Sequence, residues 1–166
     1  PDLQISVADV RKLDFKAGFF HGYWSLGVIE HFYEGYDSIL SEMARVIRPS
    51  GYLFLTFPYM SPLRRLKAQL GRYLKLPTDT AQIQKDFYQF ALDHRQVIER
   101  LKKFGFTIEL QKPFDAIKGL KDEMRLPLQR VDRSQNFFAR VARFGINRLC
   151  QSFASHVILL VAKKKL

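Results

Sequence analysis

The stretch from Gly22 to Pro58 constrains the fold more than any other part of the chain. It contains a short apolar strand at Tyr23–Leu26, a polar loop, an amphipathic helix, a Pro-Ser-Gly turn and a second apolar strand at Gly51–Phe57. This order of elements predicts a βαβ unit, and such units build parallel sheets. Because ligands of parallel sheets bind beyond the carboxyl ends of the strands, we expect functional residues in Gly27–Tyr33 and Pro58–Ser61.

The helix of this unit is the clearest element in the sequence. Pro49 and Gly51 follow it and are expected to end it. Its apolar residues recur at helical spacing, which predicts one face packed against the sheet. They are Tyr36, Ile39, Leu40, Met43 and Ile47.

Strands are also predicted before this helix. Leu3–Asp9 alternates apolar residues with polar or small ones, as a half-buried strand does. The segment Phe19–Leu26 leads into the first strand of the βαβ unit, and we expect Trp24 and Leu26 to be its buried positions.

The second half of the chain continues the α/β pattern. Asp93 is expected to cap a helix, with Gln96 as its capping-box partner, and Gly105 to end that helix in a left-handed conformation. Alternating residues then predict a strand over Phe106–Gln111. His156–Ala162 predicts a buried closing strand.

Two basic and aromatic segments, at about residues 58–89 and 115–152, interrupt the pattern and are expected to be helical insertions. In the first, Arg64 and its basic neighbours stand opposite a leucine face. In the second, arginines alternate with an apolar set made of Phe137, Phe138, Val141, Phe144, Leu149 and Phe153. Such helices suit an anionic bilayer surface, and the alternative is that they are solvated helices packed on the sheet.

Composition limits the class of protein. The chain has 166 residues, the size of one domain, and its formal net charge of +11 favours an anionic partner. A single cysteine, Cys150, excludes an internal disulfide and favours a reducing, cytoplasmic compartment. No apolar run reaches the roughly 20 residues of a membrane span. The four histidines are scattered, so we expect no metal site.

Four collinear matches resemble class I S-adenosylmethionine-dependent methyltransferases of the type 11-like group. ADVRKLDF at Ala8–Phe15 resembles a strand-end D-x-x-x-L-P-F segment, and FFHGYWSLGVIEHF at Phe19–Phe32 resembles F-D-x-V-x-S-x-x-V-x-E-H. SEMARVIRPSGYLFLTFP at Ser41–Pro58 resembles E-x-x-R-V-L-K-P-G-G-x-L-x-x-x-x-P. A helix that ends at Phe104–Phe106 before a strand resembles the penultimate unit of that fold.

The resemblance implies a partial Rossmann-like methyltransferase fold: an α/β domain with a mostly parallel sheet, helices on both faces and the two helical insertions. It covers the carboxyl-terminal portion of the family fold. The Gly-rich turn and the acidic residue that hold the family's cofactor have no counterpart in this sequence. We therefore expect residues 1–166 to form a single, incomplete methyltransferase domain. An uncovered sheet edge and an open apolar face would then favour self-association or pairing with a missing N-terminal segment.

The resemblance also implies which residues contact S-adenosylmethionine. The Asp9 carboxylate would accept a hydrogen bond from the adenine amino group, with the Val10 backbone facing the ring. The alternative for Asp9 is a turn or cap residue. The run Ser25, Leu26, Gly27 and Val28 follows the next strand, where glycine permits close approach of the backbone to a ligand. The alternative for this run is an ordinary tight turn.

Catalytic and substrate residues are less specified by the sequence. His31 is a candidate general base, because imidazole titrates near neutral pH; the alternative is that Glu30 and His31 hold the loop by hydrogen bonds. Tyr33, Tyr59 and Arg64 are candidates to line an acceptor site. Methyl transfer mainly needs donor and acceptor to be aligned, so the lack of a dense catalytic cluster does not count against it.

The sequence thus predicts a basic, truncated fragment of a methyltransferase whose intact parent methylates a small or lipid-linked acceptor. We expect the fragment to have little or no activity alone. The alternative is a non-catalytic basic module that binds an anionic membrane surface or nucleic acid. Nucleic acid is disfavoured because the basic residues lie on amphipathic helices and form no known recognition motif. The expected location is cytoplasmic, with a peripheral membrane contact as the variant.

Overall fold

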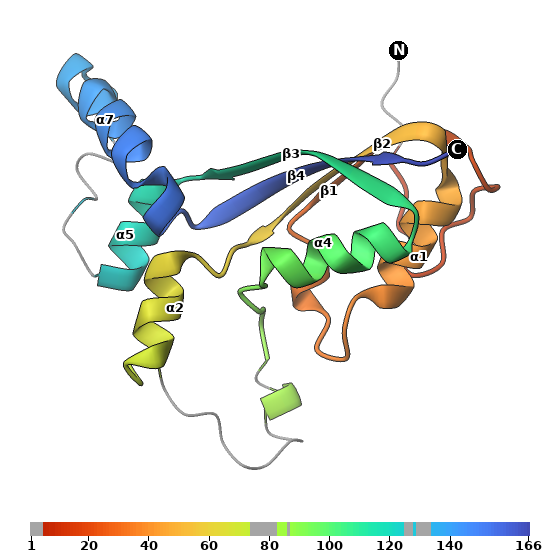
Figure 1. Cartoon of the computed structure of the whole chain (residues 1–166), viewed down its shortest axis with the longest axis horizontal. Coiled ribbons are helices and arrows are strands. Elements are labelled where there is room, and N and C mark those ends of the chain that lie inside the picture. The colour runs from red at the N-terminus through yellow and green to blue at the C-terminus, as the bar shows by residue number, and fades with distance from the viewer. Residues whose placement is uncertain (1–4, 74–82, 86, 125–127, 129–133) are drawn as a thin grey trace.

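The computed structural model describes residues 5–73, 83–85, 87–124, 128 and 134–166. Parts of both predicted insertions, including Leu74 of the first leucine face, lie outside the described residues. The described chain forms an α/β structure around one sheet (Figure 1), which confirms the predicted fold class.

The sheet of the described residues is mixed and not purely parallel. It contains β1 (Phe20–Leu26), β2 (Ile47–Pro58), β3 (Phe106–Phe114) and β4 (Val157–Lys164), in the order β1-β2-β4-β3. β1 pairs with β2 in parallel, whereas β4 pairs antiparallel with both β2 and β3. β1, β2 and β3 therefore run in the same direction, which agrees with the predicted mostly parallel sheet, and β4 is the antiparallel strand.

The predicted βαβ unit is confirmed. Helix α1 (Asp37–Val46) connects β1 to β2, whose strands pair from Gly22↔Tyr52 to Leu26↔Thr56. The predicted Pro-Ser-Gly turn lies inside an irregular start of β2, where the register of the pair shifts. A Cβ at Gly51 would come within 2.9 Å of the backbone oxygens of Arg48 and His21, so this turn requires glycine.

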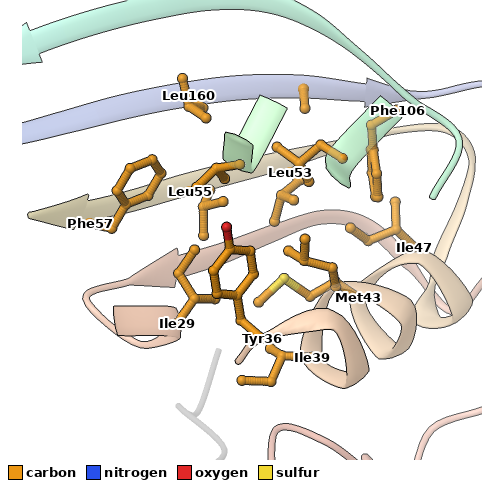
Figure 2. Close-up of a cluster of buried hydrophobic side chains, with 14 of the residues drawn as sticks. Ile29, Tyr36, Ile39, Met43, Ile47, Leu53, Leu55, Phe57, Phe106 and Leu160 are labelled. Atoms are coloured by element: carbon orange, nitrogen blue, oxygen red, sulfur yellow. The ribbon is translucent and has the colours of Figure 1, made fainter. Parts of the chain in front are cut away.

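One face of the sheet carries the hydrophobic core (Figure 2). Helices α1 and α4 (His94–Lys103) lie on this face (Figure 1). Figure 2 shows the apolar face of α1 pointing toward β2 and β4, as its spacing predicts. The fully buried side chains include Ile39, Met43, Leu53, Leu55, Phe57, Val97, Leu101, Phe106 and Leu160. Each such aliphatic side chain stabilises the fold by about 1.5–3 kcal/mol through burial.

The predicted ends of α4 are confirmed. The Asp93 carboxylate accepts a hydrogen bond of 3.0 Å from the Arg95 backbone N–H, and Gly105 adopts φ of +83° after the helix. The glycine is needed there because residues with a Cβ rarely adopt this conformation. β3 follows α4 directly in the chain, and α4 contacts β3.

The predicted strand at Leu3–Asp9 is wrong over its described part. Residues 5–8 have no regular structure, and Asp9 makes only an isolated bridge with Lys12. Ile5 is 85% exposed. The alternating pattern suits a strand, but a strand also needs a neighbour, and no described strand lies beside this segment to pair with it.

The predicted burial of Trp24 and Leu26 is also wrong. Trp24 is 64% exposed, and Leu26 is exposed beside it, while Ser25 faces the core. Successive side chains of a strand point to opposite faces, and here the two large residues point to the face that no described helix covers. Trp24 stacks on Phe54 of β2 with ring centroids 4.3 Å apart, so this open face is apolar.

Three further helices gather at one end of the sheet (Figure 1): α2 (Pro62–Gln69), α5 (Ala116–Met124) and α7 (Phe137–Ala154). α5 and α7 approach closely at Gly119. A Cβ at this position would lie 1.7 Å from the Ala154 carbonyl oxygen, so the close approach requires glycine. None of the described helices combines the length and the apolarity needed to cross a bilayer.

A buried polar network joins these helices to the sheet. Arg64 of α2 donates to Glu123 of α5 at 2.7 Å, and it also donates to the Tyr59 carbonyl at 2.9 Å. Lys67 donates to Glu123 at 2.7 Å. Burial alone raises the pKa of Glu123, but the hydrogen bonds from Lys67, Arg64 and Tyr73 outweigh burial and lower that pKa to about 2.

His156, just before β4, completes the network. Its Nδ1 lies 2.8 Å from Arg64 Nη2, and its Nε2 lies 2.8 Å from Lys118 Nζ. Arginine can only donate, so Nδ1 accepts and the imidazole is neutral. Burial, followed by the charges of Arg64 and Lys118, lowers the pKa of His156 from 6.5 to about 4, although Asp122 and Glu123 oppose this shift.

This pKa makes stability depend on pH. The unfolded state takes up a proton at His156 below pH 6.5, whereas the folded state resists protonation down to about pH 4. We therefore expect the free energy of unfolding to decrease by about 3 kcal/mol as the pH is lowered from 6.5 to about 4. Urea titrations at several pH values measure the effect. His156→Gln should flatten the slope, and the exposed His21→Gln should not; equal slopes in all three proteins would contradict the argument.

The open sheet face and the unpaired edge of β1 predict self-association. We expect the apparent molecular mass in sedimentation velocity to exceed that of the monomer. The sequence has one tryptophan, so emission from Trp24 should move to shorter wavelength as protein concentration rises. Phe54→Ser should weaken both effects, because its ring stacks on Trp24. Leu149→Ser on α7 is the control for loss of an exposed apolar side chain elsewhere. A chain that stays monomeric at high concentration would contradict this prediction.

Candidate functional site

The carboxyl ends of β1 and β2 meet at one edge of the sheet, as parallel pairing requires. β1 ends at Leu26 and β2 at Pro58, and the Gly27 backbone N–H donates to the Thr56 carbonyl at 3.1 Å. The two segments in which we expect functional residues, Gly27–Tyr33 and Pro58–Ser61, therefore begin side by side. This edge is the candidate site.

The turn after β1 combines a left-handed glycine with a buried hydroxyl. Gly27 has φ of +70°, and a Cβ there would lie 3.3 Å from Glu30 Oε1. Ser25 is 2% exposed, and its Oγ has no hydrogen-bond partner among the described residues. A buried hydroxyl without a partner is costly, so it marks a place where a further polar group would be stabilised.

Glu30 is the second unsatisfied group at this edge. It lies in a short 3-10 helix, Ile29–His31, and its side chain is buried. Its Oε2 has no hydrogen-bond partner within the described part of the chain. Burial raises the pKa of Glu30, against smaller opposing effects of its own backbone N–H and of His31. A buried carboxyl group with a raised pKa thus lies next to Gly27.

His31 is held in one orientation. Its Nδ1 lies 2.7 Å from the Tyr88 carbonyl oxygen, and its ring meets the Tyr88 ring edge-on at 5.2 Å. A carbonyl oxygen only accepts, so Nδ1 carries a proton, and the neutral tautomer with this hydrogen bond has its lone pair on Nε2. Nε2 lies 3.9 Å from Glu30 Oε1, too far for a hydrogen bond.

A strap at residues 87–92 bridges the two strand ends, and sequence reasoning missed it. The Phe90 backbone N–H donates to the Glu30 carbonyl at 3.0 Å, and the Leu92 N–H donates to the Pro58 carbonyl at 2.8 Å. Met60 N–H in turn donates to the Leu92 carbonyl at 3.0 Å. The aromatic run of Phe87, Tyr88 and Phe90 is the signal that could have indicated a packed segment here.

Tyr33 joins this strap through aromatic packing. Its ring lies 5.3 Å from Phe87 and 6.0 Å from Phe90, and those two rings lie 4.4 Å apart. The cluster covers the outer side of the loop that carries Glu30 and His31. Tyr33 therefore lies next to the strap, packed against two of its aromatic rings.

Asp9 forms a local turn in this structure. Its carboxylate accepts from the Arg11 backbone N–H at 2.9 Å and pairs with the Arg11 guanidinium at 2.8 Å. The hydrogen bonds from Arg11 lower the pKa of Asp9 to about 2. Val10 next to it packs partly against the core. The carboxylate remains exposed to solvent, so a ligand could still reach it.

A polar pocket of about 450 Å³ connects these regions. It is lined by Arg11 from the first segment, Arg100 from α4, and His31, Tyr33 and Ser38 from the loop and helix after β1. Arg100 is paired with Asp37 at 2.6 Å. His31 and Tyr33 therefore share a pocket with Arg11, the partner of Asp9. Neither Asp9 nor the run Ser25–Val28 lines it.

Tyr59 and Arg64 are placed differently. Both are buried, and the Arg64 guanidinium is occupied by Glu123, His156 and the Tyr59 carbonyl. Their geometry therefore serves to attach α2 to the sheet. Glu123, the partner of Arg64, was missed from the sequence because 59 residues separate the two and no local pattern joins them.

The residues present fit one side of the cofactor that the resemblance implies. The turn Ser25–Val28 offers an unpartnered hydroxyl, an open glycine and an exposed Leu26. Asp9 offers an accessible carboxylate. Within the described ranges, no group of three or more His, Cys, Asp or Glu residues could hold a metal ion.

Comparisons with known proteins agree with this geometry. Residues 1–55 match the family model described as "Methyltransferase domain". The match ends inside β2, so it includes Asp9, the turn after β1 and all of α1. A search of the curated proteins finds no match.

Solved structures share the fold over almost the whole chain. A S-adenosylmethionine-dependent methyltransferase from Methanosarcina mazei matches with a TM-score of 0.58 and 15% identity, over 97% of this chain and 66% of that chain. One from Mesorhizobium loti matches with a TM-score of 0.55 and 15% identity, over 95% and 67%. The [4+2]-cyclase SpnF matches with a TM-score of 0.54 and 17% identity, over 97% and 56%.

This chain thus spans 56% and 66% of the lengths of SpnF and the Methanosarcina mazei protein. At such identities the structures establish the fold, and the family match adds the motif residues at the candidate site. The family match thus covers about the first third of the chain, and the solved structures share its fold with S-adenosylmethionine-dependent methyltransferases.

Proposed function

We propose that this chain supplies one wall of the cofactor crevice and the acceptor side of a methyltransferase that acts on a small or lipid-linked acceptor. The observation that carries the proposal is the pair of buried, unpartnered polar atoms, Ser25 Oγ and Glu30 Oε2, beside Gly27. They lie at the carboxyl end of a parallel strand, where this fold class binds ligands.

In this proposal each residue of the site has a separate task. The turn Ser25–Val28 contacts the cofactor, and its glycine lets the backbone approach closely. The accessible Asp9 carboxylate accepts a hydrogen bond from the adenine amino group, with the Val10 backbone against the ring. Glu30 and the strap at residues 87–92 hold the loop in place.

S-adenosylmethionine, when bound, supplies a methyl group that its sulfonium already activates. The protein's main contribution is then to orient the acceptor for in-line transfer. His31 Nε2 has a free lone pair, so it can take the proton that a hydroxyl or amine acceptor releases. Tyr33 and the strap aromatics provide an apolar wall on the acceptor side.

The site as described is open, which predicts weak cofactor binding by this chain alone. Leu26 and Gly27 are exposed, and the sequence contains no Gly-rich turn of the family kind. We expect isothermal titration with S-adenosylmethionine to detect no micromolar binding, and HSQC spectra at millimolar ligand to shift the amides of Gly27 and Val28. Gly71, a left-handed glycine on a different element, serves as the control that should not shift.

The two readouts separate the parts of the proposal. Micromolar affinity would contradict the view that the chain holds only one wall of the crevice. Amide shifts that cluster elsewhere, or none at saturating ligand, would contradict the assignment of the cofactor to the turn after β1.

Glu30→Gln tests the unpartnered carboxyl group. Because burial raises the pKa of Glu30 above 4.5, the unfolded state loses this proton more readily, and wild-type stability should fall as pH rises above 4.5. The variant lacks that charge and should be more stable than wild type at neutral pH, by about 1 kcal/mol, with the difference vanishing in acid. Chemical denaturation of both proteins at neutral pH and at a pH below 4.5 measures this difference in the free energy of unfolding.

Glu34→Gln is the matched control, because Glu34 is exposed and the substitution removes one carboxylate that is already solvated. A Glu30→Gln variant that is less stable than wild type at neutral pH would show that the carboxylate has a partner in solution.

A further inference from the structure

The outer face of α7 is apolar, whereas the outer face of a surface helix on a globular domain is usually polar. Phe138 is 80% exposed, Phe144 71% and Leu149 83%, and Phe137 and Val141 beside them are also exposed. At helical spacing these five residues share the side of α7 that faces away from the rest of the described chain. We call them the α7 apolar face.

The inner side of α7 explains why the apolar face points outward. Its contacts to the domain use small and polar residues: Ala139 and Ala154 are its buried side chains, and Asn147 accepts from the Ala116 backbone N–H at 2.9 Å. Ala154 lies directly against Gly119 of α5. The helix is therefore anchored without using its large apolar residues, which stay available for an external partner.

The same side of the molecule is strongly basic. Arg140 and Arg148 are exposed on α7, interleaved with the phenylalanines. From Phe137 to the last residue, Leu166, the sequence contains no Asp or Glu. α7 projects from one end of the molecule (Figure 1), so nothing described screens these charges from a flat partner.

We propose that the α7 apolar face is a docking surface for an anionic lipid bilayer, with α7 lying in the plane of the interface. The phenylalanines, Val141 and Leu149 would enter the boundary between head groups and acyl chains, while Arg140 and Arg148 pair with lipid phosphates. This surface lies at the end of the sheet where β2 leads into α2, but none of the residues of α7 lines the pocket beside His31, and the proposal does not depend on methyl transfer.

The alternatives fit the same face less well. A second copy of the chain packed on it by a two-fold axis would bring Arg140 and Arg148 toward the arginines of its partner, and α7 offers no carboxylate to neutralise them. Nucleic acid would neutralise the arginines but would leave the aliphatic and aromatic residues without an apolar partner. A bilayer satisfies both the charge and the apolar area.

α2 lies at the same end of the molecule. It contacts α7, and its leucines Leu66 and Leu70 are exposed among basic residues. The Arg64–Glu123 pair fixes α2 to α5, so the helices form one rigid platform.

Vesicle flotation tests the proposal with the full chain. We expect it to float with vesicles of phosphatidylcholine and phosphatidylserine, to bind pure phosphatidylcholine vesicles at least about tenfold more weakly, and to lose binding as salt rises. Phe138→Ser with Phe144→Ser should reduce partitioning by about tenfold or more. Arg140→Gln with Arg148→Gln should remove the preference for phosphatidylserine.

The controls exclude unfolding and general stickiness. The substituted side chains are exposed, so circular dichroism spectra should match wild type, and Leu26→Ser on the open sheet face should float like wild type. A Trp24→Phe, Phe144→Trp protein places the fluorophore on α7 and should show a shift to shorter wavelength on binding.

Several results would overturn the proposal: no flotation of the wild type, equal binding to neutral vesicles, or unchanged flotation of the Phe138→Ser, Phe144→Ser protein. An oligonucleotide that binds with a steep salt dependence in the absence of vesicle binding would assign the surface to nucleic acid. A dimer that this double substitution dissociates, again without vesicle binding, would assign it to a second copy.

Discussion

The packing of α1 and α4 against one face of β2 and β4 is the interaction on which the rest of the structure depends. It buries the aliphatic residues of α1 against Leu53, Leu55 and Leu160 (Figure 2). This packing sets the path of α1, and the path of α1 keeps β1 and β2 parallel. Parallel strands end at the same edge, so the core ultimately brings Gly27 beside Thr56 and creates the candidate site.

The outer helices obey a different physical rule, because polar contacts hold them. Arg64 and His156 are buried and Glu123 is partly buried, and the hydrogen bonds of Arg64 to the other two offset the cost of burying its charge. Such a network contributes less free energy than apolar packing of similar volume, but it fixes orientation. It presents α2 and α7 at a defined angle to the sheet, with the apolar side of α7 left outward.

The sequence predicts elements well where periodicity and caps are local. α1, the Asp93 cap, the Gly105 end and β4 all follow from residues within one or two turns of each other. It failed for Trp24 and Leu26 because alternation shows that two faces differ, but not which one the core uses; here Ser25 takes the buried side. It failed for residues 5–8 because strand formation depends on a neighbour that the pattern cannot supply.

The residues of the candidate site likewise fall into those that local sequence predicts and those that it does not. Gly27, Ser25 and His31 could be located from the motif, since the strand end itself positions them. The strap at residues 87–92 and the Arg64–Glu123 pair could not, because both depend on contacts between residues far apart in the sequence. His31 and Tyr88 are 57 residues apart, and Arg64 and Glu123 are 59 residues apart.

The fold alone does not decide the reaction, and the solved structures illustrate this point. Methyltransferases and a [4+2]-cyclase share it with this chain at comparable similarity. What distinguishes a methyltransferase physically is a sulfonium held in line with an acceptor, and that depends on the turn after β1 and on the wall opposite it. In this chain the turn is present with two unpartnered polar atoms, Ser25 Oγ and Glu30 Oε2. Their desolvation is unfavourable unless a ligand or an adjoining surface satisfies them, so the same atoms that weaken the isolated site would strengthen a completed one.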